Sequence, residues 1–115
     1  MKKIFVLLFG LVAAVPAFAN TVACSGSAGN GVVITGAAAN FVRIDVLPKC
    51  SANVLLNWEQ TANGFATAAA STKGKQMFSG NTGGGAVTSQ GVCTNSLCTV
   101  GQLAAPLAAA LAAAT

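Results

Sequence analysis

The segment from Phe41 to Glu59 constrains the fold of this chain more than any other part of the sequence. Its apolar side chains alternate with polar ones in two runs on either side of Pro48, a pattern typical of half-buried β-strands. Because proline cannot donate a hydrogen bond to a strand ladder, Pro48 marks the end of the first run. We therefore predict strands over 41–47 and 54–61, with buried side chains at Val42, Ile44, Val46, Val54, Leu56 and Trp58.

Direct pairing of these two strands in a hairpin would place Val46 opposite Val54 and Val42 opposite Trp58. The same register puts three charged residues together on the other face, namely Arg43, Asp45 and Glu59. Exposed charge pairs contribute only about 0–1 kcal/mol to stability. We therefore expect this face to be a solvated surface without chemistry of its own.

Turn signals predict more strands around this hairpin. Asn63-Gly64 is a two-residue hairpin signal, and it predicts a third strand over 65–71 with Ala69 opposite Trp58. Asn30-Gly31 is a second signal of the same kind. The remaining predicted strands cover residues 21–27, 32–35, 76–79 and 86–93. The expected fold is mostly β, a small antiparallel sheet or sandwich-like domain of about five to seven short strands.

Residues 1–19 have the pattern of a cleavable export signal. Lys2 and Lys3 precede a long apolar run, and the segment ends in the small residues that signal peptidase accepts. We expect cleavage after Ala19, which leaves a single domain over 20–102 and a tail over 103–115. The apolar run is shorter than the roughly 20 residues that span a bilayer, so we expect no stable membrane span after cleavage.

Four cysteines remain after export, and disulfides are their default state in an oxidising compartment. Three connectivities are open, and we favour Cys24 with Cys50 and Cys93 with Cys98. A lipid anchor on Cys24 is disfavoured because polar residues interrupt the apolar run before it. A zinc site is disfavoured because histidine is absent and no second closely spaced cysteine pair exists. We therefore expect a disulfide-stabilised domain without a metal or cofactor.

The tail is almost pure alanine and leucine, which favours a short helix. Its larger apolar residues recur every four positions and form one stripe, namely Leu103, Leu107 and Leu111. An isolated helix of this length is marginal in water. Three outcomes are therefore open: the stripe docks on its own domain, binds a partner, or the tail stays disordered.

Charge and residue counts exclude several classes of function. The net charge is +4, but Lys2 and Lys3 are lost with the signal, and the only close cationic pair left is Lys73 with Lys75, so nucleic-acid binding is not expected. The absence of histidine removes Ser-His and Cys-His nucleophiles. Asp45 and Glu59 are the only carboxylates available for acid–base work, so we expect no enzyme.

Two hypotheses on function follow. The first is an exported, non-catalytic structural or interaction protein of the periplasm or cell surface, which self-associates through strand edges or the leucine stripe as a surface or filament component. The alternative is a small extracytoplasmic binding module or inhibitor. Its recognition surface would be one of two loops, Gly80–Gly85 or Cys93–Cys98.

Overall fold

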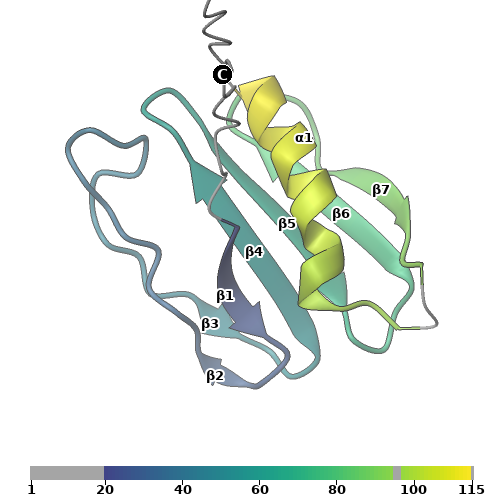
Figure 1. Cartoon of the computed structure of the whole chain (residues 1–115). Coiled ribbons are helices and arrows are strands. Elements are labelled where there is room, and N and C mark those ends of the chain that lie inside the picture. Colours follow the sequence, from purple (N-terminus) through teal and green to yellow (C-terminus); the bar gives the residue numbers. More distant parts are fainter. Residues whose placement is uncertain (1–19, 95–96, 115) are drawn as a thin grey trace, which may run out of the picture.

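The computed structural model describes residues 20–94 and 97–114, and its main element is a five-stranded antiparallel sheet (Figure 1). Across the sheet, the strands are β1 (Thr21–Ser25), β4 (Val54–Gln60), β5 (Phe65–Ser71), β6 (Gln76–Asn81) and β7 (Thr88–Val92). A smaller sheet pairs β2 (Gly29–Asn30) with β3 (Lys49–Cys50). The 3-10 helix η1 (Val100–Leu103) leads into the helix α1 (Ala104–Ala114). The prediction of a mostly β fold with a short helix in the alanine- and leucine-rich tail is confirmed.

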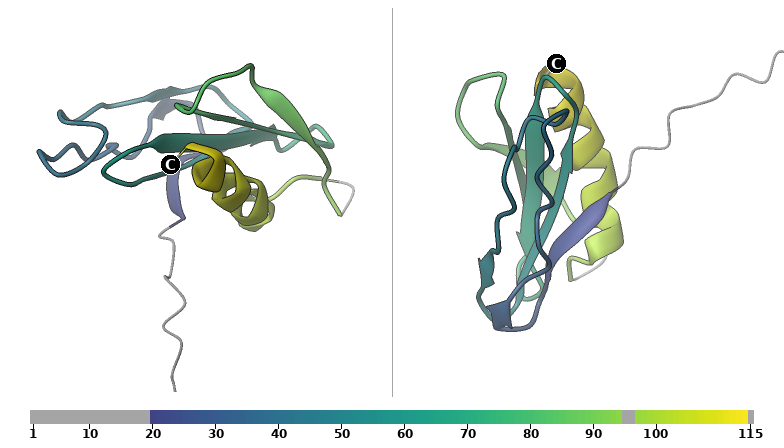
Figure 2. Two further views of the ribbon diagram at one scale, coloured as in Figure 1. Left: turned by 90° about the horizontal axis from the view of Figure 1, so that it is seen from above. Right: turned by 90° about the vertical axis from the view of Figure 1, so that its left-hand side faces the viewer.

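The sheet is the middle of three layers. Helix α1 packs on one of its faces, and residues 31–48, which we call the connector, cross part of the other face (Figure 2). The connector packs through Ile34 and Val42 against Trp58 of β4. The two faces of the sheet therefore have separate apolar clusters, and the predicted export signal over 1–19 lies outside the described residues.

The leucine stripe docks on the protein's own sheet. Leu103, Leu107 and Leu111 are all buried, and they pack on a row of alanines in β5, namely Ala66, Ala68 and Ala70. Alanine side chains are small, so the helix lies close to the strand. Pro106 is in the first turn of α1, where the missing amide proton costs no helical hydrogen bond. Of the three outcomes left open for the tail, the structure shows the first.

The hairpin of β4 and β5 forms where Asn63-Gly64 predicted a turn, but in a different register. Trp58 pairs with Thr67, and Ala69 pairs with Leu56, so the predicted pairing of Ala69 with Trp58 is wrong. The reason is the position of the turn, which is centred on Ala62-Asn63 and is closed by a 2.8 Å hydrogen bond from the Thr61 amide to the Gly64 carbonyl. A turn centred one residue earlier shifts every pair of the hairpin.

The segment 41–47 does not form a strand beside β4, which corrects the central prediction. Strand β1 occupies that edge, with Thr21 opposite Trp58 and Cys24 opposite Leu56. A strand has only two edges, and β1 and β5 fill both edges of β4. In the described connector, Val46 instead forms an isolated bridge with Ile34.

The burial predicted for the 41–47 segment is wrong for two residues as a result. Ile44 is 75% exposed and Val46 is 44% exposed, because the connector has no second layer above it in the described chain. Val42 is half-buried, as are Val54 and Leu56 on β4, and Trp58 is buried. Ile34, and not Ile44, is the isoleucine that is buried against Trp58.

The predicted hairpin at Asn30-Gly31 is also absent. Strand β2 pairs with β3 instead, and the Gly31 amide donates to the Pro48 carbonyl at 2.9 Å. These contacts join the two ends of the connector. Strands predicted over 21–27, 76–79 and 86–93 appear as β1, β6 and β7.

Both favoured disulfides are present. Cys24–Cys50 joins β1 to β3 with a Cα–Cα distance of 5.7 Å, so it closes the base of the connector. Cys93–Cys98 has a Cα–Cα distance of 5.3 Å and closes the loop between β7 and η1. No described cysteine is free.

Candidate functional site

Strand β7 is the open edge of the main sheet. It pairs with β6 on one side, and no strand in the described chain pairs with its other side. All five of its residues are exposed. Its sequence, Thr-Ser-Gln-Gly-Val, contains no charged residue and no proline, which are two of the devices that stop edge strands from pairing with other chains. A third device, a bulge, is present, because the register of β6 with β7 shifts between Met77 and Phe78.

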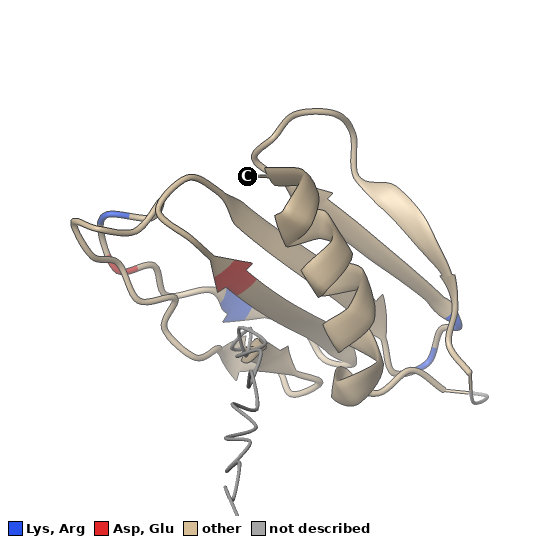
Figure 3. Cartoon of the chain, turned by 45° about the horizontal axis from the view of Figure 1, so that its top comes forward, with Lys and Arg blue, Asp and Glu red and all other residues tan. Residues whose placement is uncertain are grey.

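The distribution of charge along the sequence is a signal for this open edge, whereas the net charge is not. No charged residue follows Lys75, so β6, β7 and α1 all lack charge (Figure 3). The nearest cations, Lys73 and Lys75, lie just before β6, and the Cys93 amide donates to the Lys75 carbonyl at 2.7 Å. These cations are therefore beyond the end of β7 and leave its length uncharged.

Three exposed apolar residues adjoin this edge on the face that points away from α1. Phe78 pairs with Ser89, Val92 pairs with Gln76, and a Cβ on Gly80 would lie 3.3 Å from the Val87 side chain. Phe78, Val87 and Val92 are 44%, 69% and 57% exposed. We call these three residues the edge strip. The connector packs on Trp58 and Phe65, at the other half of the same face, and leaves the strip open.

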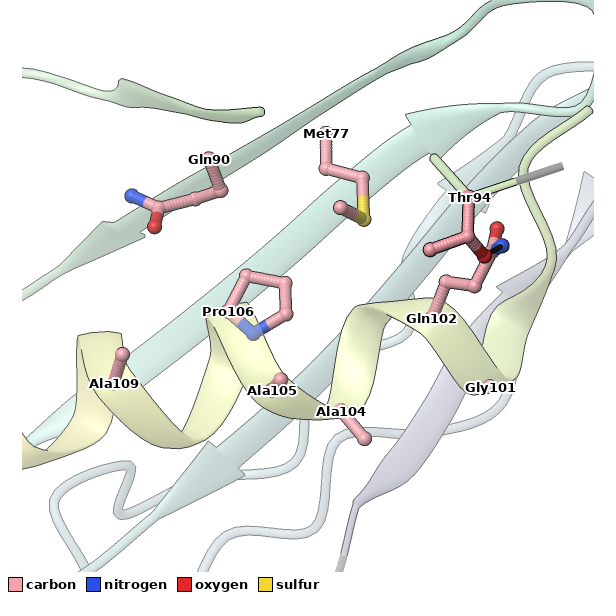
Figure 4. Close-up of a pocket in the computed structure, with 9 residues that line it drawn as sticks. All are labelled: Met77, Gln90, Thr94, Gly101, Gln102, Ala104, Ala105, Pro106 and Ala109. Atoms are coloured by element: carbon pink, nitrogen blue, oxygen red, sulfur yellow. Dashed lines mark hydrogen bonds between the residues drawn. The ribbon is translucent and has the colours of Figure 1, made fainter. Parts of the chain in front are cut away.

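On the opposite face, a groove of about 550 Å³ lies between α1 and the β6–β7 hairpin. Met77 from β6 and Pro106 from α1 contribute apolar walls, and Gln90 and Gln102 bring polar groups (Figure 4). The Gln102 side chain is held by Thr94, whose hydroxyl accepts a 2.6 Å hydrogen bond. The remaining lining residues are Gly101, Ala104, Ala105 and Ala109. The groove therefore lies beside the Cys93–Cys98 loop.

The two acidic side chains of the sequence lie on different sides of the sheet. Asp45 is exposed in the connector and accepts a 2.8 Å hydrogen bond from the Gly36 amide. Leu55, Asn57 and Glu59 are every second residue of β4, so their side chains lie on the same face of the strand. Leu55 and Asn57 face α1 and η1, and the Glu59 side chain therefore lies on that side too. They do not form the paired carboxylates of a glycosidase-like site.

The expectation that Glu59 is exposed beside Arg43 and Asp45 is wrong. Glu59 is only 7% exposed, and burial raises the pKa of its carboxyl group. The prediction failed because it paired β4 with 41–47. Strand β1 is the actual neighbour of β4, and Arg43 and Asp45 lie in the connector, which packs on the face of the sheet opposite to α1.

Asn57 is a buried polar residue that the sequence did not single out. It is fully buried, and its side-chain amide donates to Asn20 Oδ1 at 2.8 Å and to the Val100 carbonyl at 3.2 Å. Its own Oδ1 has no partner in the described chain. Asn57 therefore links the start of β1 to η1 beneath the helix.

The other residues that we considered for binding are placed as follows. Trp58 is buried and stacks on Phe65 with 6.0 Å between ring centroids, whereas Phe41 is 44% exposed. The leucine stripe is occupied by the sheet and so is not available to a partner. Gly84 and Gly85 in the Gly80–Gly85 segment have positive φ angles, which suit a turn between β6 and β7.

Two further findings concern membranes and metals. Within residues 20–94 and 97–114, no helix has the length and apolar character needed to cross a membrane. Over the same residues, no group of three or more His, Cys, Asp or Glu side chains is placed to hold a metal ion. No family model, no curated protein and no solved structure matches this chain.

Proposed function

We propose that this chain is an exported, non-catalytic interaction protein of the periplasm or cell surface that self-associates through strand β7. The export part is supported by the signal-like pattern of residues 1–19 and by the two disulfides, which are compatible with an oxidising compartment. The observation that carries the self-association part is the fully exposed, uncharged edge of the sheet at β7.

A second copy of the chain is the partner that fits this edge best. Two β7 strands that pair about a two-fold axis would satisfy each other's outer backbone groups, and no like charges would meet. The edge strip of each copy would come with its strand, so Phe78, Val87 and Val92 would lose exposed apolar area. The main sheets would then continue from one copy into the next.

The test compares two pairs of lysine substitutions with the same added charge. Ser89→Lys with Val92→Lys places cations on β7, whereas Val32→Lys with Ile44→Lys places them at exposed positions of the connector. Light scattering after size-exclusion chromatography would report the mass of the processed, oxidised protein over a wide concentration range. We expect the parent protein and the connector variant to associate and the β7 variant to be monomeric.

A parent protein that stays monomeric at every concentration would refute self-association. Equal loss of association in both variants would show that general charge repulsion, and not the β7 edge, is responsible. Fractionation of cells that produce the full chain tests export separately, since a product found only in the cytoplasm would contradict that part.

The groove favours a second candidate function, a small binding module. Its volume of about 550 Å³ lies within the range of small-molecule sites, and its apolar walls carry a few polar groups. The adjoining Cys93–Cys98 loop is one of the two loops that the sequence suggested for recognition. This function would use the helix-facing side of the molecule, and it shares Gln90 of β7 with the edge proposed for self-association.

A neutral fluorescent probe, N-phenyl-1-naphthylamine, can test the groove. Ala109→Trp fills the groove, whereas Phe78→Ser removes an apolar side chain from the opposite face. We expect Ala109→Trp to weaken probe binding about tenfold or more, and Phe78→Ser to leave it unchanged. Probe binding that is lost only in Phe78→Ser would place the apolar site at the edge strip and contradict the groove.

A further inference from the structure

Glu59 is a buried carboxylate without a charged partner in the described chain. It is 7% exposed and lies on the face of β4 that points toward α1. The elements beside and above this face are β1, β5, η1 and α1, and none of them contains a charged residue. A carboxylate that is partly shielded from water and has no cation beside it is less stable in its charged form. Burial raises the pKa of Glu59, as this environment requires.

The pairing of β1 with β4 places Asn20 next to this carboxylate. The antiparallel ladder ends with Thr21 opposite Trp58, and Asn20 and Glu59 are the residues that come next on the two strands, so a continuation of the ladder by one pair would bring them opposite each other. Residues opposite each other in such a ladder have Cα atoms about 4.5–5.5 Å apart. Asn20 is held at this position because its Oδ1 accepts the 2.8 Å hydrogen bond from Asn57, the neighbour of Glu59 on the same face.

Asn20 is also the residue that follows the expected signal peptidase site. We propose that processing after Ala19 creates the missing partner of Glu59, so that the new α-ammonium group of Asn20 pairs with the Glu59 carboxylate and completes the fold. This inference rests on the export part of the proposed function and is independent of pairing at β7.

The chemical step is an ordinary peptide hydrolysis by signal peptidase. One water molecule is consumed, the C–N bond between Ala19 and Asn20 breaks, and Ala19 leaves as a carboxylate. The Asn20 nitrogen takes up a proton at neutral pH and becomes a cation. Before cleavage the same nitrogen is a neutral amide, so the unprocessed chain cannot form this ion pair.

The ion pair has a defined dependence on pH. Pairing with Glu59 raises the folded-state pKa of the α-amino group above its ordinary value of about 7.7–8.0. At pH values where Glu59 is ionised, the stabilisation is therefore present up to about pH 8 and is lost as the pH rises through the raised folded-state pKa of the α-amino group, and it is lost again at low pH when Glu59 is protonated. No other titratable group of β1, β5, η1 or α1 faces Glu59, so the transition belongs to this pair.

The experiment uses the full chain, exported and processed in cells, with its N-terminus determined by mass spectrometry. Insertion of Gly-Ser between Ala19 and Asn20 moves the ammonium group two residues away from Glu59. Glu59→Gln removes the carboxylate, and Asp45→Asn is the matched control because Asp45 is the other carboxylate and is exposed. Thermal unfolding of each form is followed by circular dichroism from pH 6 to pH 10.

We expect an N-terminus at Asn20 and a Tm that falls by about 4–8 °C on Gly-Ser insertion at pH 6–7. Glu59→Gln should remove this sensitivity to insertion, and Asp45→Asn should retain it. The effect of insertion should also shrink toward pH 10. If Glu59→Gln fails to fold, an NMR titration of the α-amino group of the parent protein gives the same answer, because the paired group must titrate above about 8.

Two results would overturn the inference in distinguishable ways. An N-terminus at Asn20 with no effect of insertion, or with an α-amino pKa at its ordinary value, would refute the ion pair and leave export intact. Retention of residues 1–19 in an exported product would refute processing and leave export intact, whereas a product that retains them and is found only in the cytoplasm would also refute the export part of the proposed function.

Discussion

At the scale of single residues, close packing explains one glycine that the sequence suggested only as a turn former. A Cβ built on Gly64 would lie 2.7 Å from the Ala114 carbonyl oxygen, so the end of α1 rests directly on the backbone of the β4–β5 turn. The contact joins a turn to a helix that is distant in sequence. It fixes where the helix can end over the sheet.

Gly64→Ala should therefore destabilise the protein by about 1–3 kcal/mol, because the helix end must move to make room. Gly101→Ala is the matched control, since a Cβ on Gly101 meets no atom within 4 Å. Urea unfolding of both variants checks the prediction. A Gly64→Ala midpoint equal to that of Gly101→Ala would show that the helix end does not press on the turn.

At the scale of elements, the position of the connector over the sheet is set by contacts at its two ends. Residues 31–48 contain no strand in the described structure, only the isolated bridge of Ile34 with Val46. Their position over the sheet comes from the β2–β3 pair and from the Cys24–Cys50 disulfide at their base. The connector is therefore stabilised by a few long-range contacts, whereas α1 is stabilised by a continuous buried stripe.

Loss of the two disulfides should have unequal effects. The Cys24–Cys50 link spans a sequence separation of 26, so on the chain-entropy model replacing both cysteines by alanine should cost about 3.5 kcal/mol. Cys93–Cys98 spans only 5, and the same change there should cost about 2 kcal/mol. Denaturant unfolding of the two double variants measures this order, and the reverse order would contradict it.

At the scale of the whole molecule, the two faces and the two edges of the sheet differ in how much of them other elements cover. Helix α1 covers the centre of one face, and the connector covers the β1–β4 half of the other face. At the β1 edge, the Val32 amide donates to the Ala23 carbonyl at 2.9 Å, which protects part of that edge. The β7 edge has no such cover in the described chain, which is why the predicted self-association is assigned to β7 and not to β1.

The sequence by itself predicted several local elements of this protein and favoured, among three connectivities, the disulfide pairing that the structure shows. Three local patterns each correspond to an element of the structure. The alternation along 54–61 forms β4, the turn signal at Asn63-Gly64 lies in the β4–β5 hairpin, and the leucine spacing of the tail forms α1. These patterns are readable because side-chain periodicity and turn chemistry depend on neighbours in the chain.

Only the tertiary structure decided which strand lies beside β4. Residues 41–47 and β1 both carry apolar residues that suit this edge, and periodicity does not rank competing partners that are distant in sequence. The choice of β1 moved Ile44 and Val46 to the surface, buried Glu59 on the helix side of the sheet and placed Asn20 directly before the first pair of the ladder. The physical reason is that each strand edge accepts one partner. Because β1 takes the edge of β4, residues 41–47 cannot, and every residue whose burial depended on that second pairing has a different environment.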